Sequence, residues 1–270
     1  MKIRLACVAM LMAAMLSERA GSENPRWRLT WSDEFNGADG SSPDPAKWKF
    51  DIGGGRWGNR ELESYTSRAE NVEQRGGNLV ITARKEEYKG IDGVVRHFTS
   101  GRIKTRGLFA QAYGRFEARI QVPVGKGIWP AWWMLGEDIG TARWPKAGEV
   151  DVMECIGDPL RIYSTLHGPG YSGGKGISAK FAVPSGEEVN NGFHVYAVEW
   201  APNDIRFFFD AHLIAERTPK DLPHGAVWVY DHPFFLLLNV AVGGTWPGYP
   251  NETTVFPQRM LVDYVRVYSR

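Results

Sequence analysis

Residues 113–123 read Tyr-Gly-Arg-Phe-Glu-Ala-Arg-Ile-Gln-Val-Pro, and this stretch decides the fold class. Apolar side chains occupy every second position from Phe116 to Val122, and charged or amide side chains occupy the positions between them. Successive side chains of a strand point to opposite sides, so one face of this segment is apolar and the other polar. The pattern predicts a β-strand with one buried and one solvated face.

The same alternation recurs along the chain. Residues 78–84 alternate in this way, and residues 193–200 and 205–210 flank the sequence Pro202-Asn203-Asp204, whose residue types favour a hairpin turn. Residues 234–242 are apolar on both faces, which predicts a central strand covered on each side.

No segment shows a long helical repeat of apolar residues, and no Pro/Ser-rich linker or internal repeat divides the chain. Glycine-rich connections occur at residues 53–55, 170–176 and 243–244. We therefore predict a single all-β domain. Two packed, curved antiparallel sheets are the favoured architecture, with a closed barrel as the alternative.

The first 22 of the 270 residues have the features of a signal peptide: basic residues at the start, then an apolar run from Leu5 to Leu16 that is too short to span a bilayer. The mature domain is expected over residues 23–270, in the extracellular space or the periplasm, without a membrane anchor after cleavage. Its single cysteine, Cys155, excludes an intramolecular disulfide and a thiol metal site.

Bulk composition narrows the class of partner. The formal net charge of +1 provides no general field to attract nucleic acid or an anionic membrane, so a neutral substrate is expected. Aromatic residues make up 13% of the chain and include 11 tryptophans. Large sandwich cores use many aromatic side chains, so core packing accounts for most of them, and a functional role is considered for those that cluster. We expect a monomer.

Residues 148–155 read Gly-Glu-Val-Asp-Val-Met-Glu-Cys and place three carboxylates within six positions. In a regular strand Glu149 and Asp151 share one face and Glu154 lies on the other. A β-bulge, one extra residue at Val152-Met153, would return Glu154 to the first face. All three acids would then line one groove. The alternative is an edge strand with three solvated carboxylates.

Paired carboxylates of this kind suit glycoside hydrolysis. Retaining glycosidases need two carboxyl groups roughly 5–5.5 Å apart, one as nucleophile and one as acid and base. Four effective strand steps separate the Cα atoms of Glu149 and Glu154 by about 13 Å, so the two side chains must lean toward each other across a concave sheet. Asp151 lies between them, where it can share a proton with one glutamate and make the pair unequal.

The Glu-x-Asp-x-x-Glu sequence resembles the signature of glycoside hydrolase family 16 in the bulged form seen in laminarinases, and the likeness extends over most of the mature chain. The segments that carry it occur in the family's order: Asp33-Glu34-Phe35, Trp57-Gly58-Asn59 with Glu61-Leu62 and Tyr65-Thr66, Thr99 to Arg102, Gly127 to Leu135, Thr165 to Gly168 and Trp246-Pro247-Gly248. The resemblance implies a concanavalin-like jelly-roll sandwich. It also implies that Glu149 is the nucleophile, Asp151 its helper and Glu154 the acid/base.

Tryptophans beside prolines and glycines are candidate sugar platforms, since flat indoles suit pyranose faces. The resemblance places Trp129 and Trp133 along the sugar groove, and Trp246 lies in a loop of the same kind. Core packing is the alternative for each of them. For Trp132, which alternates with its neighbours, core packing is the preferred interpretation.

Three polar residues complete the predicted groove. Asn59 and Arg102 stand in loop-like segments and resemble residues that hydrogen-bond sugar hydroxyls, with a surface salt bridge as the alternative for Arg102. His167 follows the acidic strand closely and is either a core histidine or a hydrogen-bond partner near Glu154.

A structural metal ion is implied by the resemblance alone. Family members often bind calcium through a residue matching Asp263 and through backbone oxygens matching Glu34 and Gly77, and oxygen ligands suit calcium. The alternative is that Asp263 pairs with an arginine such as Arg266. No cofactor is expected for catalysis.

The expected activity is endo-acting, retaining hydrolysis of internal β-1,3 linkages in a β-glucan. Mixed-linkage β-1,3-1,4-glucan and galactans are alternative substrates, and transglycosylation would share the same intermediate. A non-catalytic β-glucan-binding module is the alternative outside enzymes, but such a module normally lacks the glutamates that this chain retains.

Overall fold

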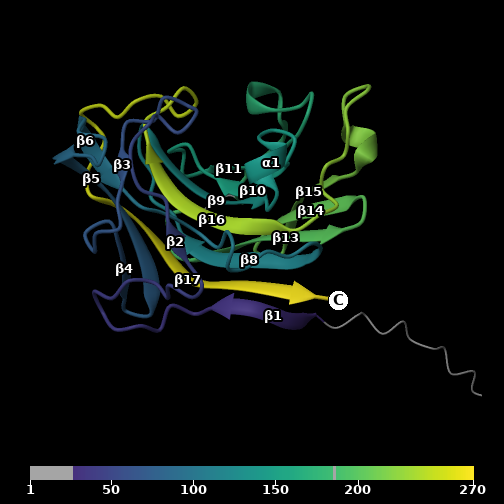
Figure 1. Cartoon of the computed structure of the whole chain (residues 1–270), viewed down its shortest axis with the longest axis horizontal. Coiled ribbons are helices and arrows are strands. Elements are labelled where there is room, and N and C mark those ends of the chain that lie inside the picture. Colours follow the sequence, from purple (N-terminus) through teal and green to yellow (C-terminus); the bar gives the residue numbers. More distant parts are fainter. Residues whose placement is uncertain (1–26, 185–186) are drawn as a thin grey trace, which may run out of the picture.

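The computed structural model describes residues 27–184 and 187–270, and they form two β-sheets packed face to face (Figure 1). The larger sheet has the strand order β15-β14-β13-β8-β17-β5-β6-β3, with β1 added to β17 and β4 added to β5. Its strands are β1 (Arg28–Asp33), β3 (Ser64–Tyr65), β4 (Val72–Arg75), β5 (Asn78–Lys89), β6 (Val95–Ser100), β8 (Gly114–Gln121), β13 (His194–Ala201), β14 (Asp204–Phe209), β15 (His212–Arg217) and β17 (Gln258–Ser269).

The smaller sheet has the order β12-β11-β10-β9-β16-β7-β2. Its strands are β2 (Lys49–Phe50), β7 (Arg102–Lys104), β9 (Ile128–Gly136), β10 (Glu149–Glu154), β11 (Arg161–His167), β12 (Ile177–Ala182) and β16 (Phe234–Val242). The helices of the described residues are short: α1 (Ile139–Ala142) and the 3₁₀ turns η1 (Gly173–Lys175) and η2 (Pro219–Asp221). Strand pairing is antiparallel except between β3 and β6.

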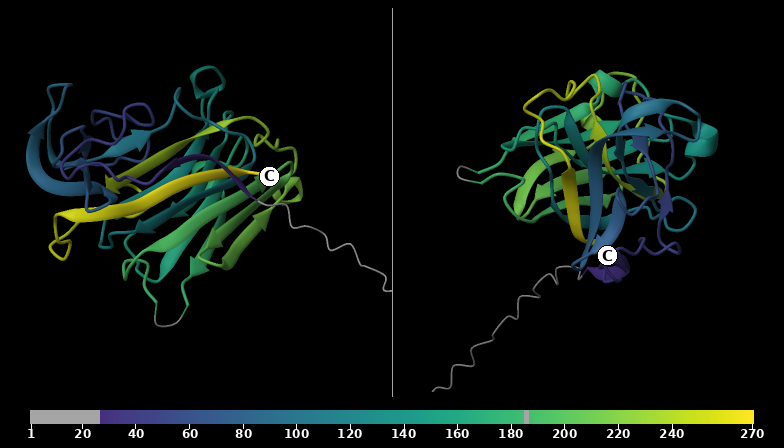
Figure 2. Two further views of the ribbon diagram at one scale, coloured as in Figure 1. Left: turned by 90° about the horizontal axis from the view of Figure 1, so that it is seen from below. Right: turned by 90° about the vertical axis from the view of Figure 1, so that its left-hand side faces the viewer.

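Both sheets have free edge strands, so the structure is a sandwich and the barrel alternative is wrong. Each sheet contains strands that are far apart in the sequence. For example, β8 lies between β13 and β17, and β9 lies between β10 and β16. The two ends of the described chain lie side by side, because β1 pairs with the end of β17 (Figure 2).

The strand predictions are confirmed at the segments that showed the clearest patterns. In β8 the side chains of Phe116, Ala118 and Ile120 are fully buried, as the alternation requires. Strands β13 and β14 form the predicted hairpin with Pro202 and Asn203 at its turn. Strand β16 is buried along its whole length and lies between β9 and β7.

The core fills the space between the sheets. The burial of Trp132 shows which face of β9 points into it. Trp132 is fully buried, together with Ile128 and Met134. The odd-numbered residues of β9 therefore point away from the core, across the other face of the smaller sheet. That face carries the candidate site.

The predicted signal peptide, residues 1–22, lies outside the described residues. None of the helices in the described ranges combines the length and apolar character that a membrane crossing needs.

Candidate active site

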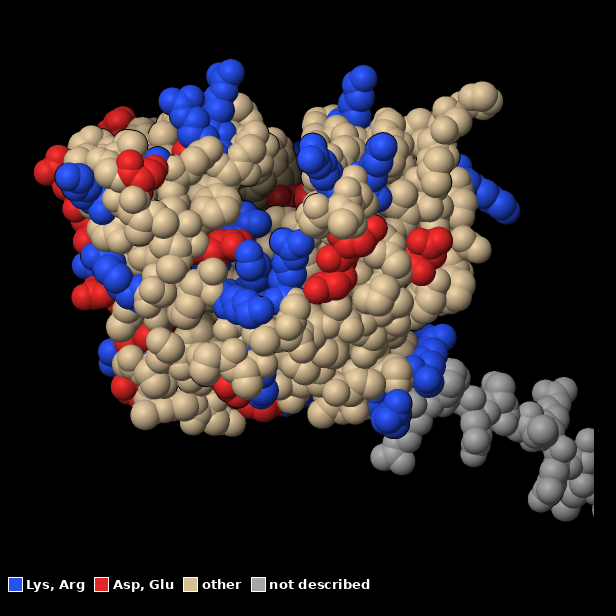
Figure 3. All heavy atoms as spheres, in the orientation of Figure 1, with Lys and Arg blue, Asp and Glu red and all other residues tan. Residues whose placement is uncertain are grey.

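A groove of about 840 Å³ crosses the outer face of the smaller sheet. Figure 3 shows a hollow between two raised parts of the surface with acidic atoms inside it. Every residue that the sequence analysis assigned to catalysis or substrate binding lines this groove: Asn59, Arg102, Trp129, Trp133, Glu149, Asp151, Glu154, His167 and Trp246.

Strand β10 forms the floor of the groove and contains the predicted bulge. Asp151 is opposite Trp133 of β9, but Met153 is opposite Trp132, so β10 has one residue more than its partner in this interval. The register with β11 shifts in the same interval, between Asp151 and Glu154. The extra residue restores the alternation and brings Glu154 to the groove face. The bulge at Val152-Met153 is confirmed.

Burial dominates the electrostatics of the three acids. Burial, assisted by the charge of Asp151, raises the pKa of Glu149 to about 8. Burial raises the pKa of Asp151 as well, and burial together with the charges of both other acids raises the pKa of Glu154 well above its ordinary value. His167 and Arg102 oppose the rise at Glu149, whereas His167 is the one charged side chain that opposes it at Glu154. The cluster therefore retains protons near neutral pH, and the charge of Arg102 favours ionisation of Glu149.

Each glutamate accepts a hydrogen bond from an indole. Trp129 Nε1 donates to Glu154 Oε1 at 3.0 Å, and Trp144 Nε1 donates to Glu149 Oε2 at 3.1 Å. Trp129 belongs to β9, whereas Trp144 lies in the loop before β10. The two acids are thus held by donors from different parts of the fold.

His167 lies beside Asp151 and Glu149 in the acidic cluster. Its Nε2 atom is 3.1 Å from Asp151 Oδ2 and 3.7 Å from Glu149 Oε1. The sequence left open a core histidine or a hydrogen bond near Glu154, whereas the antiparallel register places His167 directly opposite Glu149. The imidazole is positioned to orient Asp151 and the first glutamate.

The tryptophans separate as predicted into groove and core. Trp133 Nε1 donates to Asn239 Oδ1 at 2.8 Å on the groove face. Trp246 has 41% of its surface exposed and packs edge-on against the rings of Trp129 and Tyr163, at 5.5 and 4.9 Å. Trp132, in contrast, is fully buried in the core.

Arg102 lies between two rings of the groove wall. Its guanidinium carbon is 5.0 Å from the centroid of Trp57 and 4.8 Å from that of Trp133. The Nε atom is 3.0 Å from Asp51 Oδ2, so the ion pair considered as the alternative is also present. Arg102 begins strand β7, which corrects the loop expected from the sequence.

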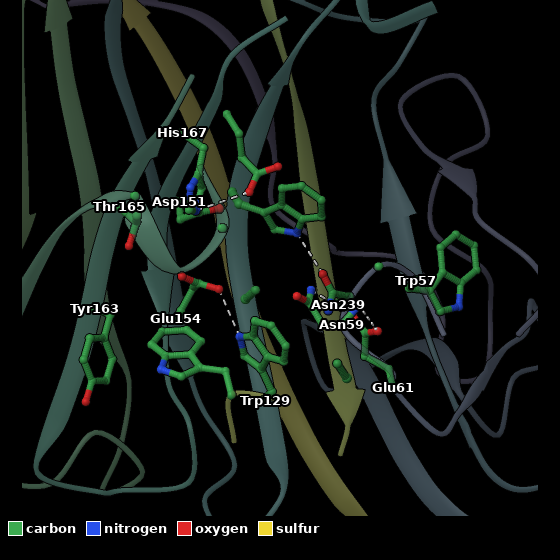
Figure 4. Close-up of a pocket in the computed structure, with 18 of the residues that line it drawn as sticks. Trp57, Asn59, Glu61, Trp129, Asp151, Glu154, Tyr163, Thr165, His167 and Asn239 are labelled. Atoms are coloured by element: carbon green, nitrogen blue, oxygen red, sulfur yellow. Dashed lines mark hydrogen bonds and ion pairs between the residues drawn. The ribbon is translucent and has the colours of Figure 1, made fainter. Parts of the chain in front are cut away.

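Asn59 belongs to a loop and lies beside Asn239 in the groove, between Tyr163 and Trp57 (Figure 4). Its backbone N–H and its side-chain Nδ2 both donate to the carboxylate of Glu61, at 2.8 and 3.3 Å. The carbonyl of Asn59 accepts from the N–H of Thr245, next to Trp246. These hydrogen bonds hold the loop in place where Asn59 lines the groove.

Several residues that line the groove were not assigned to it from the sequence, and Trp144, Tyr163 and Asn239 are among them. Asn239 is a lone amide in the apolar run of β16, which was a readable signal for a functional position. Tyr163 alternates with Thr165 and His167 along β11 and could have been found by extending the periodicity back from His167. Trp144 gave no signal beyond its place before Pro145.

The three residues of the predicted calcium site meet at one fork in the larger sheet. Strand β1 ends at Asp33, opposite Val265, and β5 pairs with β17 up to Val262, so the backbones of Glu34 and Gly77 approach Asp263 from two sides. Oxygen ligands suit calcium, and the strand register places the three residues near one another. The Asp263 carboxylate is 2.6 Å from Arg119, however, and the partner proposed as the alternative, Arg266, binds Glu34 instead. Bound calcium stays a prediction.

A groove with two unequal glutamates on its floor and indoles along its walls is the type of site that glycoside hydrolases use. The family model for glycosyl hydrolases family 16 matches residues 59–266. A β-glucanase from Rhodothermus marinus is 42% identical over 94% of this chain and 90% of its own. The chain belongs to glycosyl hydrolase family 16.

Solved structures agree with this assignment. The catalytic domain of an endo-1,3-β-glucanase (laminarinase) from Thermotoga petrophila is 47% identical, with a TM-score of 0.85 over 90% of this chain and 98% of that one. An endo-β-1,3-glucanase from Pyrococcus furiosus is 45% identical, with a TM-score of 0.86 over 90% of this chain and 94% of that one. The sandwich is the jelly roll of this family, and the chain is a glycoside hydrolase.

Proposed function

We propose that this enzyme hydrolyses internal β-1,3 linkages of a β-glucan by a retaining double displacement, with Glu149 as nucleophile and Glu154 as acid/base. One observation carries the proposal: the bulge in β10 places two buried glutamates, unequal in their ease of ionisation, on one groove floor. Asp151 lies between them and contacts His167.

In the first half of the reaction, Glu154 donates its proton to the glycosidic oxygen while Glu149 attacks the anomeric carbon. The C–O bond of the linkage breaks, the leaving sugar departs with the proton, and Glu149 becomes an ester. The raised pKa of Glu154 suits a group that must arrive protonated. Glu149 attacks in its ionised form, which the charges of His167 and Arg102 and the Trp144 N–H favour against burial.

In the second half, Glu154, now a carboxylate, takes a proton from water as the water attacks the same carbon. The ester bond breaks and returns the electron pair to Glu149. Between them the two glutamates carry one negative charge at every stage, which avoids two adjacent charges in a buried cluster. Two inversions at one carbon retain the configuration.

The substrate class follows from the groove and from the similar proteins. Indoles and the side chains of Asn59, Arg102 and Asn239 can meet the apolar faces and hydroxyls of a neutral sugar chain. The structural relatives described above are named as endo-1,3-β-glucanases, which favours β-1,3-glucan.

The test of the two roles is amide substitution. Glu149→Gln and Glu154→Gln keep the shape of each side chain and remove its ionisable group, so each should reduce laminarin hydrolysis by at least about a thousandfold with native circular dichroism. Glu87→Gln is the matched control, because the Glu87 side chain is 79% exposed on β5. Wild-type activity in either groove variant would refute its assigned role.

The substrate assignment needs its own assay. Reducing-sugar release is measured side by side on laminarin, lichenan, agarose and carrageenan, and laminarin should be cut fastest. A preference for lichenan would indicate a mixed-linkage glucanase, and a preference for agarose or carrageenan a galactan hydrolase. Binding to laminarin without any hydrolysis would indicate a glucan-binding module.

Secretion and a monomeric state belong to the same proposal. The leader over residues 1–22 supports export, and the groove is formed by one chain. Amino-terminal sequencing of exported protein and size-exclusion chromatography would test the two points.

A further inference from the structure

Trp144 touches the predicted nucleophile from outside the sheet. Its side chain belongs to the loop between α1 and β10 and is 48% exposed, yet its Nε1 atom donates to Oε2 of Glu149 at 3.1 Å. Leaving a large indole half in water forgoes burial that would stabilise the fold. A polar contact with a reacting group gives this exposed side chain a function.

The loop backbone brings the indole back over the strand that follows it. Ala147 N–H donates to the carbonyl of Arg143, and Gly148 N–H donates to the carbonyl of Pro145. Gly148 has a φ of +70°, and a Cβ at this position would lie 2.8 Å from the ring of Phe234. Glycine is therefore required where the loop enters β10. These turns hold Trp144 above a residue only five positions later.

Trp144 differs chemically from the other groups that face Glu149. Asp151 and Glu154 on β10 are carboxyl groups whose charge depends on whether they hold a proton. His167 on β11 and Arg102 on β7 act on Glu149 through their electrostatic fields. An indole N–H is a donor at every pH and never an acceptor. It therefore favours the ionised carboxylate under all conditions.

We propose that Trp144 is a positioning residue that holds Oε2 of Glu149 and leaves Oε1 to attack the anomeric carbon. Within the described residues, no hydrogen bond holds Oε1, whose neighbour His167 Nε2 is 3.7 Å away. The same N–H favours the return of negative charge to Glu149 when the ester breaks in the second half-reaction. This inference rests on the proposed function, which gives Glu149 its role.

The test replaces Trp144 with Phe, which keeps an aromatic ring and removes the donor. The matched control is Trp246→Phe, since Trp246 is similarly exposed and lines the groove without a hydrogen bond to either glutamate. Trp144→Leu, which also removes the donor, is a second variant in case the first does not fold, and the same shift of the acid limb is expected of it. The measurements are kcat and KM on laminarin from pH 4 to 9, with thermal unfolding of each variant.

Trp144→Phe should lower kcat by about tenfold with little change in KM, because the lost hydrogen bond has a charged acceptor. The acid limb of its kcat/KM profile should move up by about one pH unit, since the carboxylate loses a donor. Trp246→Phe should raise KM and leave the acid limb in place. An unmoved acid limb in Trp144→Phe, or a loss confined to KM, would overturn the inference and leave the indole as a sugar platform only.

The outcome can be separated from failure of the proposed function. If Glu149→Gln is inactive and Trp144→Phe has the wild-type profile, only the role of Trp144 is wrong. If Glu149→Gln keeps wild-type activity, Glu149 is not the nucleophile and both proposals fail.

Discussion

Trp132 and Trp246 test the groove at the scale of single residues, because one lies in the core and the other on the groove rim. Trp132→Ala should cost about 3–5 kcal/mol of stability, which lowers the melting temperature of a domain this size by about 10 °C. Trp246→Ala should melt close to the wild type and raise KM for laminarin, because a half-exposed ring contributes less to the fold. Thermal unfolding beside laminarin kinetics separates the two.

The opposite pattern would remove Trp246 from the groove: a large fall in melting temperature with normal KM and kcat in the folded fraction. Trp129→Ala and Trp133→Ala are expected to fall between the two extremes, since both rings are partly buried and both N–H groups donate to groove residues.

Single residues also show where sequence reasoning succeeds. The three acids could be predicted as site residues because burying carboxylates in an apolar strand is costly, which indicates a functional role. The side chains that His167 contacts could not be predicted from the sequence, because strand register rather than sequence distance decides which side chains meet. Trp144 could not be found for a similar reason, since its contact depends on how one loop folds back.

At the scale of elements, a buried acid joins the loop at one end of the groove to strand β16. Glu63 is fully buried, and its Oε2 atom accepts from the N–H of Val242 at 2.8 Å. Burial raises the pKa of Glu63 from 4.5 to about 7. The folded protein therefore holds a proton on this group that the unfolded chain releases.

This proton makes stability depend on pH. The contribution of Glu63 is fully present below pH 4.5 and is lost as the pH rises through about 7, because the folded state binds more protons in that window. The loss amounts to about 3 kcal/mol. Glu63→Gln cannot ionise, so between pH 5 and pH 7.5 its free energy of unfolding should fall by about 2 kcal/mol less than that of the wild type, as measured by urea unfolding. Equal pH dependence in variant and wild type would contradict this.

Strands in which apolar and polar residues alternate clearly could be predicted from the sequence, and very short strands could not. Strands β8, β13 and β14 follow from period-two patterns, and the bulge in β10 follows from the need to align three acids. Strand β7 has three residues, too few for a pattern, so Arg102 was assigned to a loop.

At the scale of the whole molecule, the fork between β1, β5 and β17 tests whether an ion contributes to stability. If calcium binds there, adding a chelator should lower the melting temperature and calcium should restore it. Asp263→Asn should weaken the response, and Arg119→Ala, which removes the competing cation, should strengthen it. A melting temperature unaffected by chelator and by calcium would mean that arginine pairing alone neutralises Asp263.

The class of the whole fold was predictable, but its topology was not. Alternation and the absence of helical repeats indicate two packed sheets. The pairing of β8 with β17 and of β9 with β16 joins segments about 100 or more residues apart, and local patterns do not specify such partners. The jelly roll was therefore expected from family resemblance rather than from the strands themselves.

The central claim is that one bulged strand carries both glutamates of a retaining mechanism, and the stereochemistry of the first product tests it most directly. Proton NMR during the first minutes of laminarin hydrolysis resolves the anomers before they interconvert. Retention predicts that the new reducing end appears first as the β anomer and that α forms later by mutarotation. An initial α product would contradict the account, because it requires water to attack directly and removes Glu149 from the role of nucleophile.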